Sequence, residues 1–313
     1  MTKKIAFLFP GQGSQSVGML SDLAKSEPQV QETFAEASEV LGFDLWQLVQ
    51  EGPAEQLNRT DRTQPAMLAA GVAVWRVWQS QGGPAPAWMA GHSLGEFSAL
   101  VCAEALTFSD AVQLVAQRGA LMQAAVPTGA GAMAAILGLE DAQVQAVCQE
   151  AAQGAVLEAV NFNAPGQVVI AGTAEAVKRA MQAAKAQGAK RAVLLPVSVP
   201  SHCALMRPAA EQFSAALEAV PFQPPRIPVL HNVSVAPATE PAEIRDLLRR
   251  QLYSPVRWVE TVQRLAQEGV KVLVEAGTGK VLTGLSKRID RRLESLALFD
   301  ADGLHHALEI TAC

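Results

Sequence analysis

The sequence predicts an α/β protein with two parts, a large domain around a parallel sheet and a small subdomain inserted into it. Short apolar runs that end in glycine turns, at residues 5–9 and 270–275, alternate with longer helical segments. Between residues 127 and 197 the order changes to strand, helix, strand, strand, helix, strand. The chain has 313 residues, of which 50% are hydrophobic and 18% charged, so it can bury a substantial core.

The first strand, residues 5–9, leads into the loop Pro10-Gly11-Gln12-Gly13. Open α/β sheets gather their chemistry at the carboxyl ends of their strands, where this loop lies. It lacks the Lys-Ser/Thr pair of a phosphate loop and the third glycine of a dinucleotide fingerprint, so nucleotide binding is not expected. A plain turn is the alternative.

Several helices are expected between residues 19 and 79, with breaks at Pro28, Gly42, Gly52-Pro53 and Pro65. The polar segment 58–65 reads as a connection, and the apolar helix 66–79 packs under the sheet. That helix is too short to span a bilayer, and the first apolar run is too short for a signal peptide. No membrane attachment is therefore expected, and the predicted location is the cytoplasm.

The pentapeptide Gly91-His92-Ser93-Leu94-Gly95 has the form of a nucleophile elbow. An apolar segment precedes it and a helical segment follows, so the large domain is predicted to be α/β-hydrolase-like. Ser93 would expose its hydroxyl at a helix N-terminus, where the amide of Leu94 can stabilise an oxyanion. An ordinary glycine-rich turn is the alternative.

The helix at residues 109–125 carries one arginine, Arg118, whose isolated position is typical of a solvated side chain. The segments that follow, 132–137, 141–152, 157–161, 167–171, 174–186 and 192–196, fit the βαββαβ order of a ferredoxin-like unit. We therefore predict a ferredoxin-like subdomain at 127–197 within a large domain formed by 1–126 and 198–313. Its turn at 161–166, with Asn163, either lines the cleft between the parts or contacts nothing.

The large domain resumes with a loop at 198–203. Helices at 204–220, 241–252 and 259–268 are expected, with strands at 227–231 and 270–275, and the glycine turn 276–280 completes the sheet. The tail after Arg292 is expected to be peripheral.

A serine hydroxyl is a weak nucleophile and needs a base, usually a histidine. His202 lies in a loop downstream of Ser93, as the hydrolase order requires. His92 is expected to project away from the serine, and His231 reads as a core residue. No acid neighbours His202, so a backbone carbonyl could orient its imidazole instead.

The bulk composition limits the function classes. Cys102, Cys148, Cys203 and Cys313 are scattered without C-x-x-C spacing, which argues against a metal site and for a reducing compartment. A formal net charge of −5 gives no general attraction to nucleic acid.

Six stretches together closely resemble the malonyl-CoA:acyl carrier protein transacylases of bacterial fatty-acid synthesis. They are residues 9–15 (FPGQGSQ), 91–96 (GHSLGE), 117–119 (QRG), 199–202 (VPSH), 251–258 (QLYSPVRW) and 277–282 (GTGKVL). The resemblance implies that Ser93 is acylated and that His202 is its base. It also implies that the backbone carbonyl of Gln251 holds the imidazole and that the amides of Gln12 and Leu94 form the oxyanion hole.

In this resemblance Arg118 pairs with the free carboxylate of malonyl, and its planar guanidinium suits that partner. No metal or redox cofactor is implied, and the chain is expected to act as a monomer. The partners are malonyl-CoA and an acidic acyl carrier protein that docks on basic residues near the cleft. Candidates are Lys178, Arg179, Lys190, Arg191, Lys280, Lys287, Arg288, Arg291 and Arg292.

Three alternatives stay open. A serine thioesterase or other hydrolase would use the same elbow with water as the acceptor. An acyltransferase of a polyketide-type pathway would use a different carrier. A catalytically silent relative would serve as a scaffold.

Overall fold

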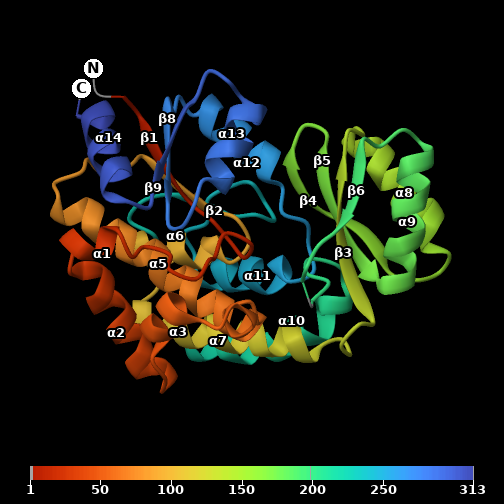
Figure 1. Ribbon diagram of the computed structural model, residues 1–313, viewed down its shortest axis with the longest axis horizontal. Coiled ribbons are helices and arrows are strands. Elements are labelled where there is room, and N and C mark those ends of the chain that lie inside the picture. Colours follow the sequence, from red (N-terminus) through yellow and green to blue (C-terminus); the bar gives the residue numbers. More distant parts are fainter. Residues whose placement is uncertain (1–2, 198, 313) are drawn as a thin grey trace.

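The structure is a computed structural model that describes residues 3–197 and 199–312 (Figure 1). In the large part, strands pair in the order β7-β2-β1-β8-β9, and every neighbouring pair is parallel. This arrangement confirms the predicted parallel sheet. The strands are β1 (Ile5–Phe9), β2 (Trp88–Gly91), β7 (Val229–Leu230), β8 (Val272–Ala276) and β9 (Glu294–Leu298).

Alternate residues of β1 face opposite sides of this sheet, which is why the whole strand is apolar. Phe7 and Phe9 belong to one core cluster, and Ala6 and Leu8 belong to another. The helices that supply the first cluster and its surroundings are α1 (Leu23–Ser26), α2 (Gln29–Leu41), α3 (Leu45–Glu51), α4 (Ala54–Leu57), α5 (Thr60–Ser80), α6 (Gly95–Cys102), α7 (Phe108–Ala124), α10 (Arg207–Ala219), α11 (Pro241–Gln251) and α14 (Ala301–Thr311), with a 3-10 turn at Ala204–Met206. The other face is covered by α12 (Trp258–Gln267) and α13 (Val281–Ile289).

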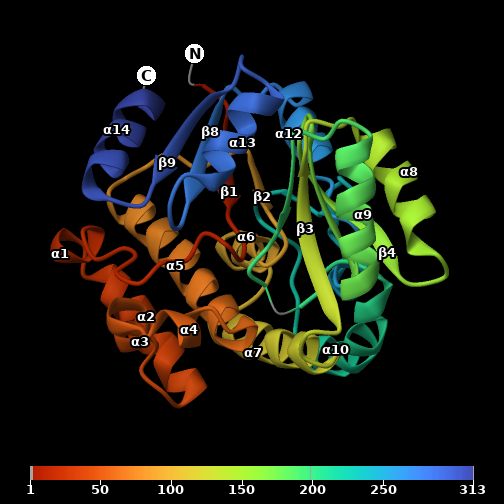
Figure 2. The ribbon, with the colours of Figure 1, turned by 45° about the vertical axis from the view of Figure 1, so that its right-hand side comes forward.

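The small part is an antiparallel sheet in the order β4-β5-β3-β6, covered on one face by two helices (Figure 2). Its elements are β3 (Gly131–Leu137), α8 (Asp141–Ala152), β4 (Leu157–Ala164), β5 (Gln167–Thr173), α9 (Ala174–Ala186) and β6 (Arg191–Leu194). Six elements in the predicted order confirm the ferredoxin-like unit. The boundaries at 127 and 197 stay a prediction, and Ser198 lies outside the described residues, as does Cys313.

Strand β4 joins the small part to the large one. The amide of Phe162 donates to the carbonyl of Val256 at 3.0 Å, and the amide of Val256 donates to Val160 at 2.8 Å. These bonds fix the face of β4 against the large domain. No helix in the described ranges has the length and apolar character needed to cross a bilayer.

The predicted helix break at Pro65 is wrong, because α5 begins at Thr60 and Pro65 lies inside it. Proline in a helix forfeits one backbone hydrogen bond and crowds the carbonyl four residues earlier. Here Thr63, Gln64 and Pro65 are all buried, so the packing of this turn offsets that loss.

Three other expectations need correction. The tail is not wholly peripheral, because β9 is an edge strand of the main sheet. The strand expected at 227–231 is confined to Val229–Leu230. Residues 161–164 belong to β4, so the expected turn reduces to Pro165-Gly166.

Candidate active site

The turn between β2 and α6 has the geometry of a nucleophile elbow. Ser93 adopts the left-handed conformation, with φ of 52°. A Cβ on Gly91 would lie 1.9 Å from the carbonyl carbon of Gly95, and one on Gly95 would lie 2.0 Å from the Phe9 oxygen. Only glycine fits at either position, which explains the small residues on both sides of the serine.

His202 lies beside the serine although 109 residues separate them in the chain. Its Nε2 is 2.8 Å from Ser93 Oγ, and its Nδ1 is 2.8 Å from the backbone oxygen of Gln251. Because a carbonyl can only accept, Nδ1 carries the proton and Nε2 is free to accept from the serine hydroxyl. The His202 main chain is also held, since its amide donates to the Leu252 carbonyl at 2.9 Å.

His202 is buried, and burial together with the charge of Arg118 lowers its pKa to about 3. The imidazole is therefore neutral at pH 7, as a general base must be.

Arg118 is almost fully buried on α7 and points at the serine. Its two terminal nitrogens donate to Gln64 Oε1 at 2.8 Å, to Gln251 Oε1 at 2.9 Å and to Ser93 Oγ at 3.3 Å. Its Nε has no partner among the described residues. Burial lowers the pKa of Arg118 to about 10 while the Glu96 carboxylate opposes this shift, so the guanidinium stays charged at neutral pH. Arg118 is thus a buried cation and not the solvated side chain that its isolated position alone suggests.

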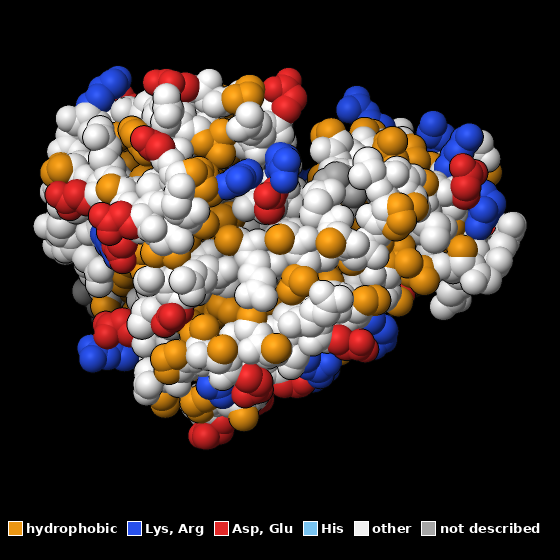
Figure 3. All heavy atoms as spheres, turned by 90° about the horizontal axis from the view of Figure 1, so that it is seen from below, with side chains coloured by type: hydrophobic (Ala, Val, Ile, Leu, Met, Phe, Trp, Pro, Cys, Tyr) orange, Lys and Arg blue, Asp and Glu red, His pale blue; other side chains and the backbone are white. Residues whose placement is uncertain are grey.

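These groups line a cavity of about 160 Å³ where the two parts of the molecule meet. Figure 3 shows the notch that separates the two parts on one face. The small subdomain contributes Asn163, whose Oδ1 lies 2.8 Å from His92 Nε2. The other lining residues are Gln12, Gln64, Ser93, Leu94, Arg118, Met122, Met133, Asn161, Val169, Leu195, Val197, Val199, Ser201 and His202.

The first loop reaches the elbow because a glycine permits close contact. A Cβ on Gly11 would lie 2.4 Å from the His92 oxygen, so this position also excludes larger residues. Gln12 and Leu94 consequently line the same cavity as Ser93. Within the described residues, the backbone amides of Gln12 and Leu94 have no recorded hydrogen bond, so both can donate to an oxyanion.

Comparisons with known proteins identify the family. Residues 6–292 match the acyl transferase domain family. The malonyl CoA-acyl carrier protein transacylase of Escherichia coli strain K12 is 60% identical over 307 residues, which cover 98% of this chain and 99% of that protein. The chain belongs to the malonyl CoA-acyl carrier protein transacylase family.

Solved structures of relatives extend this agreement to the fold. An acyl carrier protein S-malonyltransferase from Vibrio cholerae is 59% identical, with a TM-score of 0.95 over 97% of this chain and 99% of that one. A malonyl-transacylase solved in complex with a type II PKS acyl-carrier protein is 57% identical, with a TM-score of 0.97 over 98% and 99% of the two chains.

Sequence reasoning missed three residues that the structure places at the candidate site, namely Gln64, Glu96 and Asn232. Gln64 was assigned to a polar connection, but it lies on α5 and contacts Arg118. Asn232 Oδ1 accepts from the Ser93 amide at 2.7 Å, and Glu96 is completely buried behind the elbow. Only the position of Glu96 directly after the pentapeptide hinted at a role.

The remaining histidines serve other contacts. His92 lines the cavity, and its Nε2 contacts Asn163 on the small subdomain. His231 is buried as expected and lies 2.6 Å from Glu96 Oε1. His305 and His306 are exposed on helix α14.

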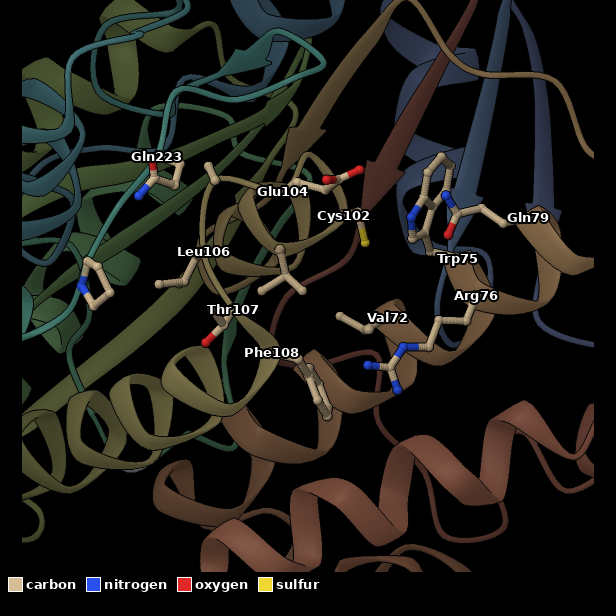
Figure 4. A pocket seen from close by; sticks show the side chains of 13 residues that line it. Val72, Trp75, Arg76, Gln79, Cys102, Glu104, Leu106, Thr107, Phe108 and Gln223 are labelled. Atoms are coloured by element: carbon tan, nitrogen blue, oxygen red, sulfur yellow. The ribbon is translucent and has the colours of Figure 1, made fainter.

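A second pocket, of about 460 Å³, lies between α5 and the α6–α7 connection (Figure 4). Its wall includes Trp75, Phe108 and Arg76, whose guanidinium lies 4.9 Å from the Phe108 ring centroid. Burial raises the pKa of the Cys102 thiol well above its usual value, so this thiol stays protonated. The residues that line this pocket include no nucleophile–base pair.

Proposed function

We propose that this chain transfers a malonyl group from malonyl-CoA to the phosphopantetheine thiol of acyl carrier protein, for fatty-acid synthesis in the cytoplasm. The observation that carries this proposal is the position of Ser93 Oγ, 2.8 Å from the base His202 and 3.3 Å from the cation Arg118. A nucleophile with a base suits acyl transfer, and a buried cation beside it suits an acyl group with a free carboxylate.

In the first half-reaction the Ser93 hydroxyl gives its proton to His202 Nε2, and its oxygen attacks the thioester carbonyl. The tetrahedral oxyanion accepts hydrogen bonds from the amides of Leu94 and Gln12. When it collapses, the carbon–sulfur bond breaks and the CoA sulfur takes the proton from His202. The Gln251 carbonyl stabilises the imidazolium between these steps.

The second half-reaction repeats these steps in the reverse order and forms the thioester between malonyl and the carrier. The carrier thiol gives its proton to His202, and its sulfur attacks the malonyl ester on Ser93. The carbon–oxygen bond of the ester then breaks, and the serine oxygen takes back the proton. Carrier and CoA thus use one site in turn, in a ping-pong order.

Arg118 selects the acyl group in this proposal. At rest its donors are occupied by the amide oxygens of Gln64 and Gln251, which are neutral acceptors. A malonyl carboxylate offers two charged acceptors in the plane of the guanidinium, whereas an acetyl group offers none.

The carrier approaches from the notch in Figure 3, where Lys and Arg side chains lie on both sides. Lys190 and Arg288 line one hollow of about 400 Å³ together with Pro165 and Gly166, which directly follow the cavity strand β4. Among the other candidates, Arg179 is engaged by the carbonyls of Ala151 and Ala152, and Arg292 pairs with Asp290. Lys178, Lys190 and Lys287 are exposed and form no ion pair within the described part of the chain, so they are the better candidates.

The test is intact-mass spectrometry after brief exposure to malonyl-CoA, with and without carrier. We expect a malonyl adduct on Ser93 that disappears when a fatty-acid carrier is added and never forms in Ser93→Ala. Rapid malonate release without carrier would instead identify a hydrolase. Loss of the adduct only to a polyketide-type carrier would identify the other acyltransferase.

A further inference from the structure

Behind the elbow lies a group of buried polar residues, here called the Glu96 cluster: Glu96, His231, Asn232 and Gln251. Of these four, the proposed mechanism uses only Gln251. Glu96 is fully buried in the first turn of α6. An unpaired buried carboxylate is strongly unfavourable, so its partners matter.

Three donors satisfy this carboxylate. His231 Nδ1 lies 2.6 Å from Glu96 Oε1. The main-chain N–H of Asn232 donates to Oε2 at 3.0 Å, and the side-chain Nε2 of Gln251 donates to the same oxygen at 2.8 Å. The three come from segments 135 to 155 residues away in the chain. Glu96 therefore joins the elbow helix to the loop after β7 and to the end of α11.

Asn232 and Gln251 also contact the serine and the arginine of the site. Asn232 accepts from the Ser93 amide at 2.7 Å and donates to the Gly91 carbonyl at 2.6 Å. Gln251 donates from Nε2 to the Ser93 carbonyl at 3.0 Å and accepts at Oε1 from Arg118. The main chain of Gln251 holds His202.

We propose that Glu96 is a positioning residue for the acyl transfer. Its Oε2 fixes which way the Gln251 side-chain amide faces and holds the main chain of Asn232. Asn232 in turn holds the strained serine, and Gln251 holds the base through its backbone carbonyl and the arginine through its side chain. Reversing the Gln251 amide would point an NH₂ group at Arg118 and a carbonyl at Glu96. The inference rests on the proposed function and adds Glu96 to it.

Position and charge can be separated with two variants. Glu96→Gln loses the charge but keeps an oxygen where the Asn232 and Gln251 donors meet, and its NH₂ can face His231 Nδ1, since a neutral imidazole can move its proton to Nε2. Glu96→Asp keeps the charge but is shorter by one carbon–carbon bond, about 1.5 Å. A positioning role makes the aspartate variant the slower one, whereas a purely electrostatic role makes the glutamine variant slower.

Glu275 offers a matched control. It is also a buried glutamate, and its oxygens accept from the amides of Leu282 and Thr283 at 3.0 and 2.7 Å, away from the cavity. Glu275→Gln and Glu275→Asp therefore reproduce the general effect of altering a buried carboxylate. Because α13 carries proposed carrier contacts, only the carrier-free half-reaction is compared.

The experiment measures single-turnover malonylation and acetylation of Ser93 by mass spectrometry, with unfolding midpoints alongside. We expect Glu96→Asp to slow malonylation about 10- to 100-fold and to lower the malonyl-to-acetyl ratio, since a misplacement near 1 Å can cost about that much. Glu96→Gln should be slowed less than Glu96→Asp, because it keeps an oxygen at the position that the Gln251 donor meets. Both Glu275 variants should stay within about threefold of the unaltered chain, because the contacts of Glu275 lie away from the cavity.

Equal rates for the two Glu96 variants, a slower glutamine variant, or equal slowing by Glu275→Asp would overturn the inference. If Glu96→Asp does not fold, Asn232→Ala replaces it, and an unaltered rate in that variant would also overturn the inference. An unaltered chain that is never malonylated would overturn the proposed function itself, and the inference with it.

Discussion

The low pKa of His202 has a measurable consequence for the pH dependence of acylation. The base is competent only when neutral, and burial with the nearby Arg118 charge lowers its pKa to about 3. The fraction of neutral imidazole therefore stays near one as the pH falls from 8 to about 5. We expect the rate of Ser93 malonylation to stay constant over that pH range, with no inflection near the ordinary histidine pKa. The rate can be measured by quenching the reaction and determining the acylated fraction by mass spectrometry.

The neighbouring His92 should not disturb this profile, because burial lowers its pKa as well. Arg118→Met removes a cation that lowers the pKa of His202. The inflection of the pH–rate profile of that variant should therefore move to higher pH. A wild-type rate that halves between pH 6 and 7 would contradict this account of the base.

Arg118 and Arg76 form a natural pair for testing acyl selectivity. Arg118→Ala should reduce the preference for malonyl-CoA over acetyl-CoA about 100-fold, because two charge-assisted hydrogen bonds are worth roughly 3 kcal/mol. Arg76 lines the other pocket, where it bonds to Glu36 and stacks on Phe108. Arg76→Ala should leave the preference unchanged in competition assays with both thioesters. If Arg118→Ala keeps the preference for malonyl-CoA, Arg118 does not bind the malonyl carboxylate.

At the scale of elements, the elbow depends on the absence of two Cβ atoms. Gly95→Ala would place a methyl 2.0 Å from the Phe9 oxygen, which is backbone and cannot rotate away. We expect a loss of about 3 kcal/mol or more in the free energy of unfolding, measured by urea denaturation.

Gly284 is the matched position for that substitution. It lies on the exposed side of α13, and an added Cβ would meet nothing within 4 Å. Gly284→Ala should therefore stabilise the chain by about 0.5–1 kcal/mol, through helix propensity alone. Equal effects of the two substitutions would show that the elbow tolerates a side chain.

The elements that the sequence predicts well are those whose signals are local. Helix α8 begins where Glu140 and Gln143 form a capping box, and its bounds match the prediction. The start of α5 was misplaced because the local signal of Pro65 is overridden by burial of its turn. Edge strand β9 was missed because its five residues carry no strong period.

The residues of the candidate site can also be divided into those with a local signal and those without one. Ser93 carries its own signature in the glycines beside it, and the resemblance supplied His202, Arg118 and Gln251. Glu96 and Asn232 could not be identified, because their role consists of contacts across 135 to 141 residues. Such contacts exist only once β7 and α11 have packed beside the elbow.

At the scale of the whole molecule, the site is shared between two parts with separate cores. The large domain supplies the serine, the base and the cation, whereas β4 of the small subdomain supplies Asn163 and closes the cavity. The backbone bonds between β4 and Val256, with Arg288 donating to the Pro165 carbonyl at 3.3 Å, hold the two parts together. A carrier that enters this cavity must contact both parts.

This arrangement predicts that the two half-reactions respond differently to surface charge. Lys190→Glu and Lys287→Glu reverse exposed charges on the small and large parts, and neither residue lines the cavity. We expect transfer to the carrier to slow about tenfold in the double variant, with a weaker dependence on salt, because electrostatic steering of an acidic partner is lost. Malonylation of Ser93 by malonyl-CoA should change less.

Lys25→Glu is the control for this prediction, since it reverses a charge on α1, where Lys25 pairs with Asp22 in an exposed contact of little energetic value. Stopped-flow or quenched mass spectrometry of each half-reaction, at low and moderate ionic strength, separates the outcomes. If Lys25→Glu slows carrier transfer as much as Lys190→Glu or Lys287→Glu alone does, the effect comes from net charge alone. If none of these variants alters the rate of transfer to the carrier, the carrier docks elsewhere on the surface.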